Sequence, residues 1–183
     1  PPRGRMGEVD QWLLAARERI EKSGIAVEIV SNGGTPDLYA AASVTAATEH
    51  RPGTYIYSDR MQVEFGVGTI SDCASTVLAT VVSMPTATRA VLDAGSKALA
   101  ADRCAAPGHG YIVGYPQAVV TSLSEEHAVV DLSGCTGRPR IGDKVRIVPN
   151  HVCVVTNLFD LVHLADGEDV IAQLPVRARG QLR

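Results

Sequence analysis

Residues 25–47, with the sequence IAVEIVSNGGTPDLYAAASVTAA, contain an apolar β-branched run, a glycine pair and a run of small residues. The first run predicts a buried strand, which the glycine pair would end. Thr35 has the character of a helix N-cap and Pro36 that of the first helical residue, so LYAAASVTAA predicts a helix. A strand, a glycine loop and a helix in this order indicate α/β architecture with parallel strands.

The same pattern extends on both sides of this stretch. Upstream, apolar residues recur at helical spacing as far as Gly24, and Trp12 fits the buried stripe of that helix. Downstream, RPGTYIYSD at 51–59 predicts a second strand and RMQVEFGVG at 60–68 a short helix. These strands and helices are too few to close a (β/α)8 barrel, which needs on the order of 250 residues. We therefore expect residues 1–70 to be the last strands and helices of a larger barrel.

A different pattern begins near residue 71. Short β-rich runs follow one another, separated by Gly, Pro and Asp, with only a possible turn at SKALAADR (96–103) between them. This predicts an all-β C-terminal domain over residues 71–183, barrel-like or sandwich-like. The expected fold class is therefore α/β plus all-β.

Composition excludes several classes of protein. The chain has 183 residues, 45% of them hydrophobic and 20% charged, and a formal charge of -3, which argues against a nucleic-acid partner. The longest charge-free run, 73–88, is too short and polar to span a membrane, and the first ten residues lack the apolar region of a signal peptide. Cysteines at 73, 104, 135 and 153 form no CxxC motif, so free thiols and a cytoplasmic location are expected.

The two glycine loops are candidates for binding a phosphate group. Gly34 and Thr35 follow the first predicted strand, and Gly53 and Thr54 lie beside the second. Glycine lets a backbone approach an anion closely, and barrels of this kind often hold a phosphate in their last two βα loops. The alternative is that both stretches are plain turns.

The segment VPNHVCVV, 148–155, places His151 and Cys153 two residues apart. If it is a strand, both side chains point to one face. They could then hold a metal ion, form a nucleophile and its base, or be buried in the core. A thiol enzyme, with Cys153 as the nucleophile and His151 as its base, fits poorly, because a strand holds the two side chains side by side and not aimed at each other. If the pair binds a metal ion, the thiolate ligand favours zinc over manganese or magnesium.

Five runs together resemble one known family: the C-terminal half of the D-threonine aldolase and D-serine dehydratase family. They are VSNGGTP (30–36), TEHRPGTYIYSDRMQ (48–62), LDAGSKAL (92–99), LSEEH (123–127) and GDKVRIVPNHVCVVTNLFD (142–160). The resemblance implies a pyridoxal-phosphate enzyme of the alanine-racemase-like fold type III, with an N-terminal barrel and a C-terminal β domain. It also implies phosphate contacts at Thr35, Gly53 and Thr54, and metal ligands at His151 and Cys153.

The resemblance further implies a lyase acting on D-3-hydroxy amino acids, as a homodimer. Family members that perform aldol cleavage use manganese-type metals and carry Asp where this chain has Cys153, so zinc and the dehydration of D-serine to pyruvate and ammonia are favoured. Retro-aldol cleavage of D-threonine to glycine and an aldehyde is the alternative. Asp59 and Gln62 are expected to line the substrate pocket.

The family's Schiff-base lysine has no counterpart in this sequence. Lys22, Lys97 and Lys144 do not occupy its position, which lies in the N-terminal half of the barrel. The sequence therefore predicts that this chain is inactive by itself and needs the N-terminal barrel half of the same enzyme. A non-catalytic metal-binding fragment remains the other interpretation.

Overall fold

The computed structural model describes residues 6–181. The first helix, α1, spans Met6–Lys22 and confirms the helical spacing read from the sequence. It is attached through Asp10, whose carboxylate accepts hydrogen bonds from the Thr45 hydroxyl and the Ala46 amide. The predicted buried stripe is wrong for Trp12, which is 69% exposed, because most of the surface of α1 faces away from the rest of the chain.

The α/β part is more irregular than predicted. Strands β1 (Ser31–Asn32) and β2 (Glu49–His50) pair in parallel, as expected, but each has only two residues. The strand predicted over RPGTYIYSD is wrong, because β2 precedes that stretch and η2 (Thr54–Ile56) is a 3-10 turn. The predicted helix is the 3-10 helix η1 (Thr35–Ser43), which begins after Gly34 rather than after Thr35. Within η1 only Thr35 is buried, so little packing supports a full α-helix.

Two short helical segments lie before the large sheet, and a third is inserted between strands of that sheet. They are α2 (Arg60–Glu64), η3 (Ile70–Asp72) and α3 (Ser96–Leu99). The predicted helix in RMQVEFGVG is confirmed by α2.

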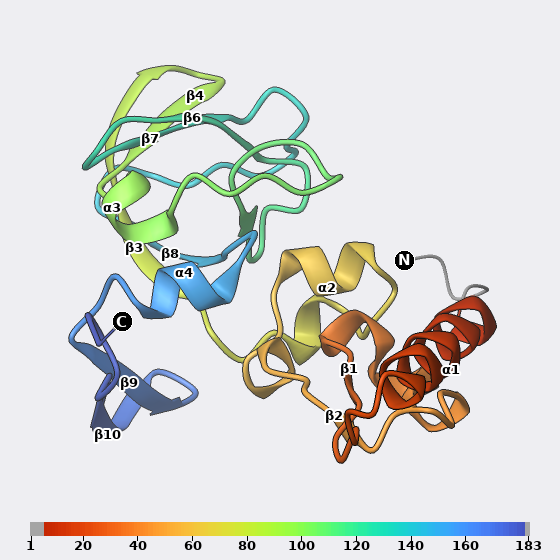
Figure 1. The fold of residues 1–183 in the computed structure, drawn as a ribbon. Helices are drawn as coiled ribbons and strands as arrows, with labels where there is room; N and C mark the ends of the chain where they lie inside the picture. Colours follow the sequence, from red (N-terminus) through yellow and green to blue (C-terminus); the bar gives the residue numbers. More distant parts are fainter. Residues whose placement is uncertain (1–5, 182–183) are drawn as a thin grey trace.

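The second pattern forms a six-stranded antiparallel sheet in the order β5-β8-β3-β4-β7-β6. The amide of His109, just before β5, donates to the carbonyl of Val120 in β6 at 3.0 Å, so the two edges approach each other and the sheet is a nearly closed barrel (Figure 1). The β-rich, barrel-like expectation is thus confirmed here. The strands are β3 (Val77–Thr86), β4 (Arg89–Leu92), β5 (Tyr111–Ile112), β6 (Val119–Leu123), β7 (Ala128–Asp131) and β8 (Lys144–Val148).

Alternating side chains fill this barrel. In β3, Val77, Ala79 and Val81 are buried, whereas Leu78 and Val82 are exposed, which is the period of two expected for a strand with one wet face. Val81, Val120 and Ile147 are wholly inaccessible to solvent. Each fully buried side chain of this size contributes about 1.5–3 kcal/mol through the hydrophobic effect.

After β8 the chain leaves the barrel. It forms the short helix α4 (Val152–Thr156) and then a separate antiparallel hairpin of β9 (Leu161–Asp166) and β10 (Asp169–Pro175), which lies beyond α4 (Figure 1). Among the residues described, no helix combines the length and the apolar character needed to cross a bilayer. The boundary predicted at residue 70 stays a prediction.

Candidate functional site

Two segments far apart in the sequence meet where the two parts of the chain join. The amide of Arg60 donates to the Pro149 carbonyl and that of Met61 to the Asn150 carbonyl, both at 3.1 Å. These bonds place the start of α2 against the residues that lead into α4. The candidate site is built around this junction.

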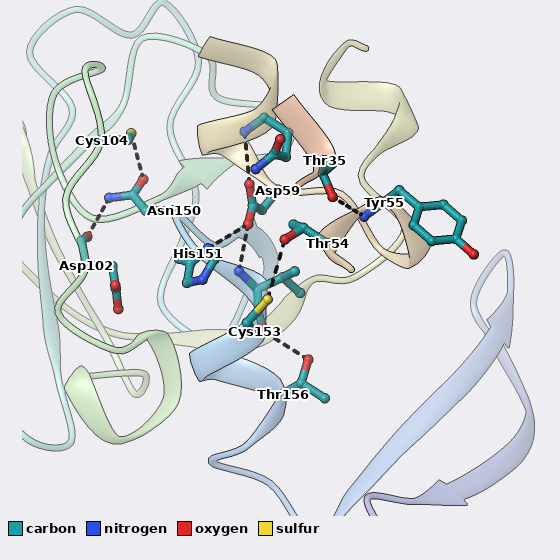
Figure 2. Close-up of polar contacts among 12 residues, drawn as sticks. Thr35, Thr54, Tyr55, Asp59, Asp102, Cys104, Asn150, His151, Cys153 and Thr156 are labelled. Atoms are coloured by element: carbon teal, nitrogen blue, oxygen red, sulfur yellow. Dashed lines mark hydrogen bonds and ion pairs between the residues drawn. The ribbon is translucent and has the colours of Figure 1, made fainter. Parts of the chain in front are cut away.

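The strand predicted through His151 and Cys153 is wrong. Strand β8 ends at Val148, since Pro149 has no N–H to continue the ladder, and His151 precedes α4 as its extended N-cap residue, with φ -135° and ψ 109°. The two side chains still lie toward the same segment, residues 54–59 (Figure 2). His151 Nδ1 is 3.1 Å from Asp59 Oδ2, and Cys153 Sγ is 3.5 Å from Thr54 Oγ1.

Asp59 is the central polar residue of the junction and has no exposed surface. Its Oδ1 accepts a hydrogen bond from the Gln62 amide at 2.9 Å, and its Oδ2 accepts one from the Val152 amide at 2.9 Å. Gln62 is also buried, at 3% exposure. Both side chains thus point into the protein interior. Their role in a substrate pocket stays a prediction.

The two glycine loops lie against each other. The Thr35 hydroxyl, which is 3% exposed with the rest of its residue, accepts a hydrogen bond from the Tyr55 amide at 3.1 Å, and it retains its own proton for donation. A Cβ at Gly53 would meet nothing within 4 Å, and one at Gly34 would meet only Pro36 Cδ at 3.6 Å. In the described part of the chain, the amides of Gly53 and Thr54 have no acceptor. Open backbone with free donors fits a phosphate group.

Sequence reasoning missed a polar pair beside these loops. Both ring nitrogens of His50 are buried, and so is Asn32 Nδ2; none of the three has a partner among the described residues. Asn32 and His50 are directly paired in the parallel ladder. Gly33 has φ +96°, and a Cβ there would overlap the His50 imidazole, so glycine is required at this position. The only sequence signal was their position: Asn32 follows the first predicted strand, and His50 directly precedes the second.

Asn150 was missed altogether, although it is 1% exposed. Its Nδ2 donates to the carbonyls of Asp102 and Gly108, both at 2.9 Å, and its Oδ1 lies 3.4 Å from Cys104 Sγ and from Arg60 Nη1. Asn150, which directly precedes His151, therefore holds the loop before β5 against the start of α4 (Figure 2).

The donor set at the junction fits a metal ion. An imidazole and a thiolate are two of the usual ligands of zinc, and Cys153 is exposed while the His151 side chain is 26% exposed. Among residues 6–181, no group of three or more His, Cys, Asp or Glu side chains is arranged around one point. Two protein ligands would leave positions open for water or substrate, unlike the four that close a structural zinc site.

The thiol-enzyme interpretation finds no support in the geometry. Over the described residues, the hydrogen-bond partner of the Cys153 thiol is the Thr54 hydroxyl, whereas the imidazole of His151 contacts Asp59. A nucleophile and its base need to lie within, or close to, hydrogen-bonding distance of each other.

The lysines lie on the surface and are engaged elsewhere. Lys97 is paired with Glu126 at 2.7 Å and Glu125 at 2.9 Å, and hydrogen bonds to these carboxylates raise the pKa of its ammonium group. Lys22 lies near Glu18, and Lys144 Nζ donates to the Thr80 hydroxyl. A protonated, ion-paired Lys97 is unsuited to attack a carbonyl group. The expectation that the cofactor lysine has no counterpart in this chain stays a prediction.

Residues 74–165 match the family described as the putative serine dehydratase domain. An uncharacterized protein of Mycobacterium tuberculosis is 41% identical over 128 residues, which cover 67% of this chain and 96% of that protein. A D-threonine aldolase of Arthrobacter is 35% identical, over 82% of this chain and 40% of the enzyme. The D-serine dehydratase of Dictyostelium discoideum is 30% identical, over 84% of this chain and 43% of the enzyme.

Solved structures of related enzymes also superimpose on this chain. The D-threonine aldolase of Filomicrobium marinum superimposes with a TM-score of 0.82 at 25% identity, over 99% of this chain and 49% of that one. A variant of D-threo-3-hydroxyaspartate dehydratase with a histidine replaced by alanine gives 0.83 at 25% identity, over 94% and 49%. A second variant of that dehydratase, with the cysteine two positions later replaced, is in a metal-free form. This chain corresponds to the C-terminal part of these enzymes and spans about half their length.

Proposed function

Because this chain belongs to the putative serine dehydratase domain family, we propose that it is the C-terminal portion of a pyridoxal-phosphate-dependent and metal-assisted lyase acting on D-3-hydroxy amino acids. The family resemblance inferred from the sequence is confirmed by the match. One observation carries the proposal: His151 and Cys153 lie beside residues 54–59, directly after the open glycine loop at Gly53. The predicted metal ligands thus contact the segment that begins at the predicted phosphate loop.

Each part of the site has a definite task in this proposal. The free amides of Gly53 and Thr54, with Gly34 and the Thr35 hydroxyl, hold the phosphate of the cofactor. The His151 imidazole and the Cys153 thiolate hold zinc. When bound, pyridoxal 5'-phosphate supplies an electron sink for the substrate's α-carbon, and the metal supplies a Lewis acid for its β-hydroxyl.

Dehydration of D-serine is the favoured reaction. The solved D-threo-3-hydroxyaspartate dehydratase has a histidine and a cysteine two residues apart, the spacing found here, and its cysteine variant was solved in a metal-free form. The Arthrobacter aldolase shows that aldol cleavage also occurs among the relatives, so cleavage of D-threonine is the second candidate. The partners proposed are the D-amino acid, an N-terminal barrel half and a second copy in a homodimer, in the cytoplasm.

The experiment measures zinc and cofactor binding by the full chain and two pairs of variants. Cys153→Ala should lose a stoichiometric zinc ion, while Cys135→Ala, in the barrel core, should keep it. Gly53→Val should weaken binding of pyridoxal 5'-phosphate in equilibrium dialysis by removing the open space beside the backbone. Gly137→Val is its control, because a Cβ at Gly137 also meets nothing within 4 Å.

Zinc that remains in Cys153→Ala would contradict the metal site, and equal cofactor affinity in Gly53→Val would make its loop a plain turn. Zinc bound without any affinity for the cofactor would favour the non-catalytic metal-binding module. With the N-terminal half supplied, pyruvate from D-serine and glycine from D-threonine distinguish the two reactions.

A further inference from the structure

The Asp59 carboxylate makes one contact that helix capping does not explain. Its bonds to the Gln62 and Val152 amides, both at 2.9 Å, satisfy orphan donors at the starts of α2 and α4. The third contact, 3.1 Å from Oδ2 to His151 Nδ1, reaches a ring 92 residues away in the chain. An imidazole is not needed to cap either helix.

The chemistry of the carboxylate decides which ring nitrogen carries the proton. An ionised carboxylate has acceptors only, and here both oxygens face backbone N–H groups. His151 Nδ1 must therefore donate to Asp59. In the neutral imidazole this leaves the lone pair on Nε2, the nitrogen that points away from the carboxylate and is available to a metal ion.

The backbone holds Asp59 in this position. The Arg60 and Met61 amides bond to Pro149 and Asn150, which are the two residues before His151. Ser58 has φ 54°, a left-handed conformation that costs a non-glycine residue about 1–3 kcal/mol, and its amide is fixed to the Thr54 carbonyl at 2.7 Å. This strained turn directs the Asp59 side chain inward, toward the imidazole of His151 (Figure 2).

We propose that Asp59 is a positioning residue for the metal ligand His151. It fixes the tautomer with a free Nε2 and holds the ring in the orientation in which it binds zinc. A ligand histidine commonly donates its second nitrogen to a carboxylate, and loss of such a partner lowers metal affinity about 10- to 100-fold. The inference rests on the metal site proposed above and replaces the substrate-pocket role predicted for Asp59.

The test uses the full chain and the variant Asp59→Ser. Serine keeps an oxygen that caps the Gln62 amide but is too short to reach His151. Asp72→Ser is the matched control, because Asp72 is an exposed carboxylate that accepts from the Thr69 amide at 2.7 Å and does not contact the ligands. Two quantities are measured: the affinity for Zn²⁺ alone, by competition with a chromophoric chelator, and the tautomer of His151 in metal-free protein, by ¹⁵N NMR assigned with His151→Gln.

We expect Asp59→Ser to bind zinc about 10- to 100-fold more weakly and to lose the pure Nδ1–H tautomer, with both quantities unchanged in Asp72→Ser. An Nε2–H tautomer in the wild-type chain overturns the inference without any variant, even if Asp59→Ser does not fold. So does an unchanged tautomer in Asp59→Ser, whatever its zinc affinity. If the wild-type chain binds no zinc, or His151→Gln binds it equally well, the metal proposal fails, and the tautomer alone decides the role of Asp59.

Discussion

Replacing Asn150 by alanine tests whether the junction between the two parts of the chain depends on one buried amide. The substitution removes the donors to the carbonyls of Asp102 and Gly108, each 2.9 Å from Nδ2. Arg60 is less affected, because its Nη1 also donates to the carbonyls of Pro107 and Gly110, both at 2.9 Å. The loss therefore concerns two carbonyl groups that accept no other hydrogen bond among the described residues.

The magnitude follows from the cost of an unsatisfied buried acceptor, about 1–3 kcal/mol each. The bond to Gly108 is buried and that to Asp102 only partly buried, so Asn150→Ala should lower the free energy of unfolding by about 2–5 kcal/mol, somewhat less than twice the full cost at its upper end. This is a large part of the about 5–15 kcal/mol typical of a native protein. Asn150→Asp should be at least as destabilising, because it places a carboxylate oxygen opposite two carbonyl oxygens.

Urea denaturation of the full chain, followed by circular dichroism, measures this change. Asn157→Ala is the control: Asn157 is exposed and its side chain makes no hydrogen bond among the described residues, so the change should stay within about 0.5 kcal/mol. If Asn150→Ala costs no more than this control, the hydrogen bonds of Asn150 do not hold the loop, and the reasoning is refuted.

Two further predictions concern the glycine loop and the response to acid. Gly33→Ala should lower the free energy of unfolding by about 2–5 kcal/mol, because it combines a positive φ with overlap of the His50 ring, whereas Gly34→Ala, in extended backbone, should change it by less than about 0.5 kcal/mol in the same urea assay; similar losses in both would contradict the close approach to His50. Burial and the nearby Arg103 lower the pKa of His109, so the unfolded chain takes up its proton first as the pH falls. The contribution of His109 to stability is therefore full above about pH 6.5 and is lost below it, and His109→Leu should lose less stability than the wild-type chain between pH 7.5 and pH 5; an equal loss would show that other groups cause the effect.

The barrel was predictable because its signal is local. In β3 each inward residue alternates with an outward one, and the same period recurs in β7, where Ala128 and Val130 are buried. Alternation needs no knowledge of the partner strand, so it can be read from one sequence. The pairing order and the closure between His109 and Val120 could not, since they depend on which edges meet in space.

The same distinction explains the error at His151 and Cys153. Their residue types and spacing identified a candidate metal pair, but the valines around them wrongly predicted a strand. Pro149 ends the ladder, and α4 starts because a carboxylate from Asp59 caps the Val152 amide. No pattern near residue 151 contains that information, because the capping group lies 93 positions away from the amide it caps.

The sequence alone determined the types of side chain available to the site, namely the imidazole, the thiol and the two glycine loops, together with the β-rich character of the second half. These properties depend on composition and on short-range periodicity. The tertiary structure alone decided that Thr54 and Asp59 lie against Cys153 and His151, and that Asn150 joins the two parts of the chain. It also decided that Asn32 and His50 have buried nitrogens with no partner in the described part of the chain. These features depend on which segments meet in space, because they bring together residues that are far apart in the sequence and share no local pattern.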